Sequence, residues 1–144
     1  MALPITALAA AALALLLVGL TVHAVRLRKR HGVAFGDGGH PPLRRAIRAH
    51  GNLIEYMPIG LTMIALLEGS GEPRWMLAPL ATLFVAARLV HGFGVQREGE
   101  RIGPLRSWGI VTTLAVLTIM AVWLAVLAGR SLGFWRAFLP WDYS

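Results

Sequence analysis

The segment RRAIRAHGNLIEYMP, residues 44–58, decides the fold class, because it places charged and polar side chains at the front of an otherwise apolar run. The residues that follow it, as far as Leu67, are apolar apart from Thr62. Apolar runs of about 20 residues are typical of helices that cross a membrane. We therefore expect a membrane helix over residues 44–67. Its polar first half needs a specific role, since charges are costly inside a bilayer.

Three further apolar runs flank this segment, over residues 3–25, 74–95 and 105–129. Hydrophobic residues make up 56% of the 144-residue chain and charged residues only 15%, which is more apolar than a typical soluble domain. Glycine and proline in the connectors break the helical pattern between the runs. The sequence predicts an all-α, integral membrane four-helix bundle that forms a single domain over residues 1–144.

The first apolar run also allows a second interpretation, as a signal peptide that ends near His23. A signal peptide carries basic residues before its apolar run, and the run is short. Here the basic residues Arg26, Arg28, Lys29 and Arg30 follow the run, and residues 1–25 carry no charged side chain. We therefore favour a retained first helix.

The basic residues indicate how the chain lies in the membrane. The formal net charge is +7, and Lys29 is the only lysine beside the arginines. Basic residues of membrane proteins collect in cytoplasmic loops, so this charge does not by itself indicate nucleic acid, and we expect no nucleic-acid partner. Most of them fall in two connectors on one side: Arg26, Arg28, Lys29, Arg30, Arg44, Arg45, Arg97, Arg101 and Arg106.

Both termini are then predicted to lie outside the cytoplasm. The arginine-rich, alanine-rich and glycine-rich composition is typical of a GC-rich coding sequence. We expect a protein of a bacterial inner membrane with both termini periplasmic. The chain has no cysteine, which excludes a protein thiol nucleophile and a thiolate metal site. His31 and His40 have no ligand partners at metal spacing, so no metal is expected.

Three polar residues of the 44–67 helix share one face. Helical residues advance about 100° each, so Asn52 falls about 40° to one side of Arg48 and Glu55 about 20° to the other. The three form one narrow polar stripe, while His50 points the other way. In the 74–95 helix, Arg88 and His91 are three positions apart and also share a face.

The two polar groups are also predicted to lie at one depth. Glu55 lies roughly 16 Å along its helix from Arg44, and Arg88 roughly 14 Å back from Arg97. Both groups then occupy the cytoplasmic half of the bundle. One interpretation is that Arg48, Glu55 and Arg88 pair with one another and only fix helix register. The excess of arginine over glutamate instead favours a cavity for a ligand with several carboxylates and one ammonium.

At these residues the chain resembles the MAPEG family, which contains the microsomal glutathione transferases and the leukotriene and prostaglandin E synthases. The resemblance rests on RAHGNLIEYMP at residues 48–58, on ARL at 87–89 and on RIGP at 101–104. It covers about residues 3–128. It implies a four-helix protomer that assembles as a homotrimer, with glutathione bound between neighbouring subunits on the cytosolic side.

The resemblance also implies a role for each site residue. Arg48 would bind a glutathione carboxylate, Asn52 would hydrogen-bond the tripeptide, and Glu55 would take its α-ammonium. Tyr56 would lie beside the site, with Arg88 and His91 contributing from the next helix. Arg101 matches the family's arginine near the cysteinyl sulfur and is the predicted catalytic residue.

The implied activity is that of a glutathione-dependent membrane transferase or peroxidase, which conjugates the glutathione thiolate to hydrophobic electrophiles. A nearby cation lowers the pKa of a thiol, and the attacking sulfur then comes from the substrate. Membrane lipid and the electrophile are the other expected partners. His91 and Val95 stand where the synthases have tyrosines, and Val95 cannot donate a hydrogen bond.

Two alternatives stay open beside this activity. A non-catalytic protein of the same fold that binds glutathione or lipid would fit the loss of a tyrosine at Val95. A small four-helix multidrug exporter would need a carboxylate in its first helix, and residues 3–25 contain none.

Overall fold

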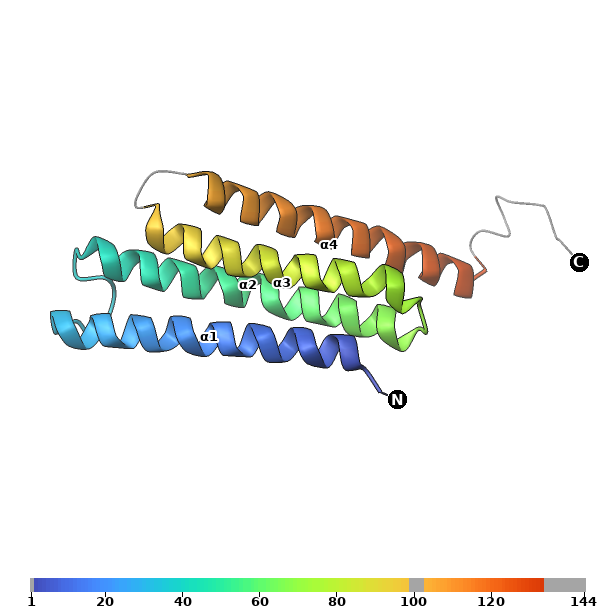
Figure 1. The fold of residues 1–144 in the computed structure, drawn as a ribbon, viewed down its shortest axis with the longest axis horizontal. Coiled ribbons are helices and arrows are strands. Elements are labelled where there is room, and N and C mark those ends of the chain that lie inside the picture. Colours follow the sequence, from blue (N-terminus) through green and yellow to red (C-terminus); the bar gives the residue numbers. More distant parts are fainter. Residues whose placement is uncertain (1, 99–102, 134–144) are drawn as a thin grey trace, which may run out of the picture.

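A computed structural model describes residues 2–98 and 103–133 and contains no strand among them. Its helices are α1 (Pro4–His31), α2 (Pro41–Gly69), α3 (Arg74–Arg97) and α4 (Pro104–Ser131). They run alternately in opposite directions along one long axis (Figure 1). The expected all-α fold is confirmed. Every helix continues at one or both ends beyond the apolar run that predicted it, most clearly α1, which extends to His31.

Proline and glycine mark the helix ends. α1, α2 and α4 each have a proline in the first turn, where the missing N–H would have no helical partner in any case. α1 ends at Gly32, which adopts the left-handed conformation with φ 65°, and its amide donates to the carbonyl of Lys29 at 3.4 Å. The basic residues of the last turn of α1 lie at the negative end of the helix dipole, which stabilises them there.

Three of the four described helices, α1, α3 and α4, are long and apolar enough to cross a membrane. α2 has 29 residues but is not among them. The polar residues of its first half lower its mean hydropathy. That residues 44–67 also cross the membrane therefore stays a prediction.

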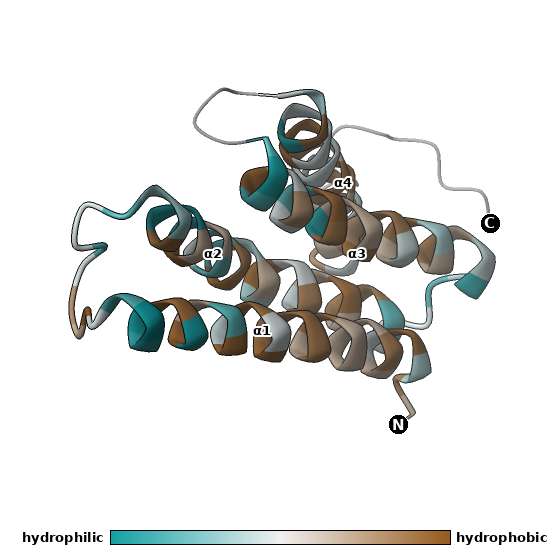
Figure 2. Ribbon diagram, turned by 60° about the vertical axis from the view of Figure 1, so that its left-hand side comes forward, coloured by the Kyte–Doolittle hydropathy of each residue, from teal (hydrophilic) through white to brown (hydrophobic). Residues whose placement is uncertain are grey.

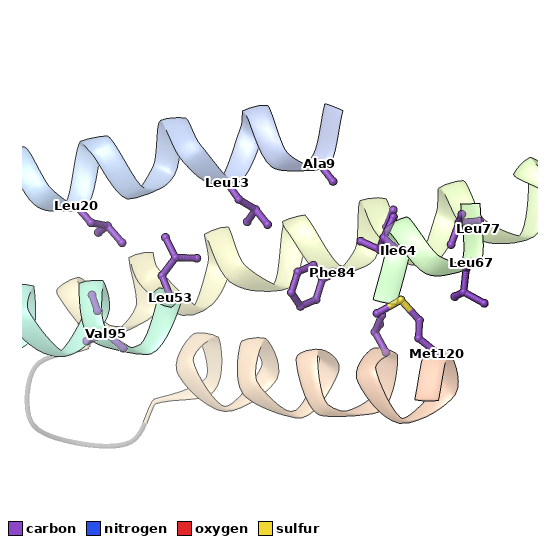
Figure 3. Close-up of a cluster of buried hydrophobic side chains, with 13 residues drawn as sticks. Ala9, Leu13, Leu20, Leu53, Ile64, Leu67, Leu77, Phe84, Val95 and Met120 are labelled. Carbon is purple, nitrogen blue, oxygen red and sulfur yellow. The ribbon is translucent and has the colours of Figure 1, made fainter. Parts of the chain in front are cut away.

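α1, α2 and α3 pack against one another, and α4 packs against α3 and α2. In Figure 1, α1 and α4 accordingly lie on opposite sides of the α2–α3 pair. The core between the helices is built from buried aliphatic side chains around Phe84, among them Leu13, Leu53 and Ile64 (Figure 3). Phe84 reaches α2 at Gly60, where a Cβ atom would overlap its ring.

The two ends of the bundle differ in polarity. The connector over residues 32–40 and the end of α3 lie at one end, and the N-terminus lies with the 70–73 turn at the other (Figure 1). Hydrophilic residues gather where α1 ends and α2 begins (Figure 2). There Arg28 donates to the carbonyls of Ala34 at 3.1 Å and Gly36 at 2.9 Å, and Arg44 pairs with Asp37. This is the end that carries the predicted site residues.

Candidate ligand-binding site at the polar end of the bundle

Arg88 of α3 joins three helices at the polar end. Its side chain is only 1% exposed. One guanidinium nitrogen donates to Thr113 Oγ1 of α4 at 3.2 Å, and another donates to Asn52 Oδ1 of α2. The guanidinium also lies over the Tyr56 ring, 5.1 Å from its centroid. Arg88 and Asn52 therefore lie at one level, as expected for the polar groups of the 44–67 and 74–95 helices.

A buried arginine is stable only where its neighbours replace the water that it loses. Asn52 supplies an amide oxygen and Tyr56 a ring face. The Thr113 hydroxyl accepts from Arg88 and donates to the Gly109 carbonyl at 2.7 Å, within its own helix. Arg88 Nε has no hydrogen-bond partner in the described part of the chain. This arrangement, the Arg88 clamp, fixes the register of α2, α3 and α4.

Arg48 and Glu55 lie on the outward face of α2. Arg48 Nη1 is 3.5 Å from Glu55 Oε1, at the long limit of a hydrogen bond, and both side chains are more than half exposed. Glu55 also interacts electrostatically with Arg88. The predicted stripe is therefore divided, with Asn52 turned into the Arg88 clamp and Arg48 and Glu55 facing outwards as an open ion pair.

Glu55 differs from the other carboxylates of the described residues, because each of those holds a structural element in place. Their partners are the Arg44 guanidinium for Asp37, the amides of Ile5 and Thr6 for Glu68, the Trp123 indole for Glu72, and the amides of Leu105 and Arg106 for Glu98. The loose contact with Arg48 leaves Glu55 with most of its hydrogen-bonding capacity. The open ion pair can therefore accept a ligand without loss of a structural contact.

His91 lies inside the α3–α4 contact. It is 4% exposed, and its Nδ1 lies 3.0 Å from the carbonyl oxygen of Arg106. A Cβ atom at Gly109 would come within 2.6–2.8 Å of His91, so the two helices touch through backbone here. The structure brings His91 to α4, whereas its role toward glutathione stays a prediction. Val95 is also buried, at 3% exposure.

Arg101, the predicted catalytic residue, lies outside the described residues, whereas Glu98 at the end of α3 and the start of α4 are described. Glu98 accepts hydrogen bonds from the amides of Leu105 at 2.7 Å and Arg106 at 3.1 Å, and so caps α4. A Cβ atom at Gly103 would lie 2.2–2.5 Å from the Glu98 carboxylate. Sequence reasoning missed Glu98. The sequence feature that could have indicated this role is an acidic residue shortly before the Gly-Pro pair that begins a helix.

Within residues 2–98 and 103–133, no group of three histidine or acidic side chains lies close enough to hold a metal ion. Among the charged side chains of the polar end, Arg48 and Glu55 are an exposed cation and anion, and Arg88 is a buried guanidinium. Such a set suits a small zwitterionic or polyanionic organic ligand, because carboxylates and ammonium groups can pair with it directly.

The bundle has three apolar helices of membrane length, with the buried Arg88 clamp and the outward ion pair of Arg48 and Glu55 at one end. These features define a small helical membrane protein with a candidate polar site. Residues 6–126 match the MAPEG family, and the chain belongs to that family. This confirms the resemblance that the motifs of α2 and α3 indicated.

The chain is also similar to the inner membrane protein YecN of Escherichia coli, from strain K12 and from strain CFT073 of serotype O6:H1. Each is 36% identical over 118 residues, which is 82% of this chain and 88% of the relative. The name of these relatives states a membrane location and no activity.

Proposed function

We propose that this protein is a glutathione-dependent transferase or peroxidase that acts on hydrophobic electrophiles at the cytoplasmic side of a bacterial inner membrane. Membership of the MAPEG family and the similarity to inner membrane protein YecN support the class and the location. The observation that carries the proposal is the open ion pair of Arg48 and Glu55 beside the Arg88 clamp.

The charges of glutathione fit this site. The tripeptide has two carboxylates, one α-ammonium and a thiol. Arg48 would bind one carboxylate through a two-pronged contact, and Glu55 would take the ammonium. Asn52 and Tyr56 contact the buried Arg88 and would bind the peptide part of glutathione. Arg88 and His91 of α3 would order these side chains. Because Arg48 and Glu55 are already 3.5 Å apart, one ligand can reach both.

The chemistry needs no nucleophile from the protein, which has no cysteine. The ordinary thiol pKa is about 8.5, and a neighbouring cation lowers it. Arg101 would supply that cation, so that the thiol releases its proton to water. The thiolate sulfur then bonds to the electrophilic carbon of the second substrate, and the leaving group departs with its electron pair. An apolar second substrate reaches the site from the bilayer.

A homotrimer is part of this proposal. Arg48 and Glu55 face away from their own protomer, and a half-exposed charge pair at membrane depth is costly unless another surface covers it. A neighbouring copy placed against this face of α2 would cover the pair and enclose the ligand. Both termini would then lie in the periplasm, with the polar end in the cytoplasm.

The activity can be tested by following conjugation of glutathione to a chromogenic aryl halide in detergent. We expect Arg101→Ala to lower kcat/KM by at least about tenfold, since a lost charged contact is worth about 1.5–3 kcal/mol. Arg97→Ala is the matched control, because Arg97 is exposed on the last turn of α3 and stacks on Phe93. Equal rates for wild type, Arg101→Ala and buffer would contradict a catalytic role.

A second candidate is a non-catalytic protein of the same family that binds glutathione or lipid. The specific observation in its favour is Val95, which is buried where the synthases carry a tyrosine, so no hydroxyl reaches the site from that position. Glutathione binding by calorimetry without turnover of any aryl halide or hydroperoxide would select this candidate.

A further inference from the structure

A groove runs between α1 and α3, along residues 5–12 of α1 and 78–89 of α3. Its volume is about 350 Å³, within the range of small-molecule sites. Ile5, Ala9 and Ala12 line it from α1, and Ala81, Val85 and Leu89 line it from α3. Thr82 is the single polar side chain of its lining. The groove therefore offers almost no hydrogen bonds to a ligand.

The groove opens toward the bilayer. Both of its helices are apolar enough to cross the membrane, and its rim residues Leu8 and Leu89 are 75% and 46% exposed. Small side chains such as Ala12 and Ala81 leave the hollow, where larger ones would fill it. A surface hollow at this depth is filled by hydrocarbon, because an empty one forfeits the dispersion contacts of its lining.

A cation stands at one end of the groove. Arg74, the first residue of α3, is exposed and lies one turn before the lining residue Ala78. Positions 74, 78, 81, 85 and 89 recur at helical spacing, so Arg74 is on the face that forms the groove. Trp75, next to it, is 77% exposed, which is typical of the level of the lipid headgroups.

One carboxylate interacts with this cation, that of Glu68 at the end of α2. It accepts hydrogen bonds from the amides of Ile5 at 2.9 Å and Thr6 at 2.8 Å, and from the Thr6 hydroxyl at 2.7 Å. Its charge is therefore largely satisfied by the N-terminus of α1. Arg74 keeps donors for an anion at the mouth of the groove.

From these contacts we propose that the α1–α3 groove binds one membrane phospholipid, with an acyl chain along the groove and the phosphate on Arg74. Arg74 lies on the helix face that forms the apolar groove. Together they complement a molecule that has an anionic group at the end of a hydrocarbon chain. A helix of a second copy is about 10 Å across, so only some of its side chains would enter a hollow of this size. The proposal is independent of glutathione chemistry at the other end of the bundle.

The experiment measures phosphatidylglycerol retained by the purified protein in native mass spectrometry. Ala12→Phe places a ring in the groove, and Ala14→Phe puts the same ring on an exposed position of α1 outside the lining. We expect wild type and Ala14→Phe to retain one lipid per protomer and Ala12→Phe to lose it. Equal retention by the two phenylalanine variants would overturn the proposal.

The phosphate contact is tested by Arg74→Gln, with Arg130→Gln as the control at the exposed end of α4. Because an exposed ion pair is worth up to about 1 kcal/mol, Arg74→Gln should weaken phosphatidylglycerol binding about fivefold and leave diacylglycerol binding unchanged. An equal effect of the two glutamine variants would overturn the phosphate contact. If Ala12→Phe instead dissociates an oligomer without loss of lipid, the groove holds a second copy and the proposal is wrong.

Discussion

At the scale of single residues, Arg88 sets the geometry of the polar end. It is the only charged side chain among the buried residues of the described chain, and its partners come from α2 and α4. Its planar group donates in two directions at once and stacks on the Tyr56 ring. A lysine cannot reproduce this geometry, because an ammonium is a compact point charge without a planar fork.

Arg88→Lys is therefore expected to be destabilising although it keeps the charge. A lost hydrogen bond to a charged group is worth about 1.5–3 kcal/mol, so the midpoint of thermal unfolding in detergent should fall clearly. Arg130→Lys, an exposed substitution of the same type, should leave the midpoint unchanged. An identical midpoint for both variants would show that the Arg88 clamp does not hold the helices together.

Helical angles predicted which α2 residues share the face of the candidate site, but not which of them are buried and which are exposed. Arg48, Asn52 and Glu55 do share one side of α2. α3 packs against the part of this face that carries Asn52 and leaves Arg48 and Glu55 uncovered. Angles along one helix carry no information on where a neighbouring helix stops, so the exposure of Arg48 and Glu55 required the packed structure.

Asp37 provides a titration test in the connector between α1 and α2. The hydrogen bond from Arg44 lowers the pKa of the Asp37 carboxyl below its ordinary value, and the Gly39 amide acts in the same direction. A lowered pKa means that the contact is present above the ordinary value and is lost as the pH falls through the lowered one. The connector should therefore keep its conformation down to about pH 4.

The measurement is an NMR titration of the Asp37 carboxyl carbon in wild type and Arg44→Gln. We expect the pKa to rise in the variant, because the first of its causes is removed. Arg26→Gln is the control, since Arg26 is exposed on α1 outside the connector. A pKa that is the same in all three proteins would contradict the Arg44 contact.

At the scale of elements, the apolar runs predicted the four helices and placed each near its observed position. The ends differ because a helix does not stop where its membrane-crossing part stops. α1 continues past the apolar run to His31, where Gly32 reverses the chain. α2 begins at Pro41, since a proline in the first turn loses no helical hydrogen bond.

The contact of α3 with α4 depends on glycine. Gly109→Ala would place a Cβ atom 2.6 Å from His91 Cβ and 2.7 Å from its amide nitrogen, so the helices must separate. Overpacking of this kind costs about 1–3 kcal/mol. We expect a lower thermal midpoint and a weakened Arg88 clamp, because Thr113 moves with α4.

The matched control is Gly19→Ala on α1, where an added Cβ atom meets nothing within 4 Å. Its midpoint should be equal to or slightly above that of wild type, since alanine favours a helix more than glycine. If Gly109→Ala unfolds no earlier than Gly19→Ala, α3 and α4 are not held at close approach.

At the scale of the whole molecule, the alternating topology brings the polar ends of α2, α3 and α4 to one end of the bundle (Figure 1). The sequence predicted this gathering, because helices that cross a membrane one after the other run in opposite directions, which brings Glu55 and Arg88 to one depth. It also carried the MAPEG motifs, which the family match over residues 6–126 confirms. The trimer and the side of the membrane on which the site lies stay predictions, because both depend on surroundings outside one chain.

The proposed function requires glutathione to bind to the open ion pair of Arg48 and Glu55. Calorimetric titration of glutathione into the detergent-solubilised protein tests it most directly, with Glu55→Gln beside Glu72→Gln as a control at the opposite end of the bundle. We predict binding by wild type and by Glu72→Gln, and affinity at least about tenfold weaker for Glu55→Gln, the loss of one charged contact. Absence of binding by wild type, or equal affinities of all three proteins, would contradict glutathione binding at Arg48 and Glu55.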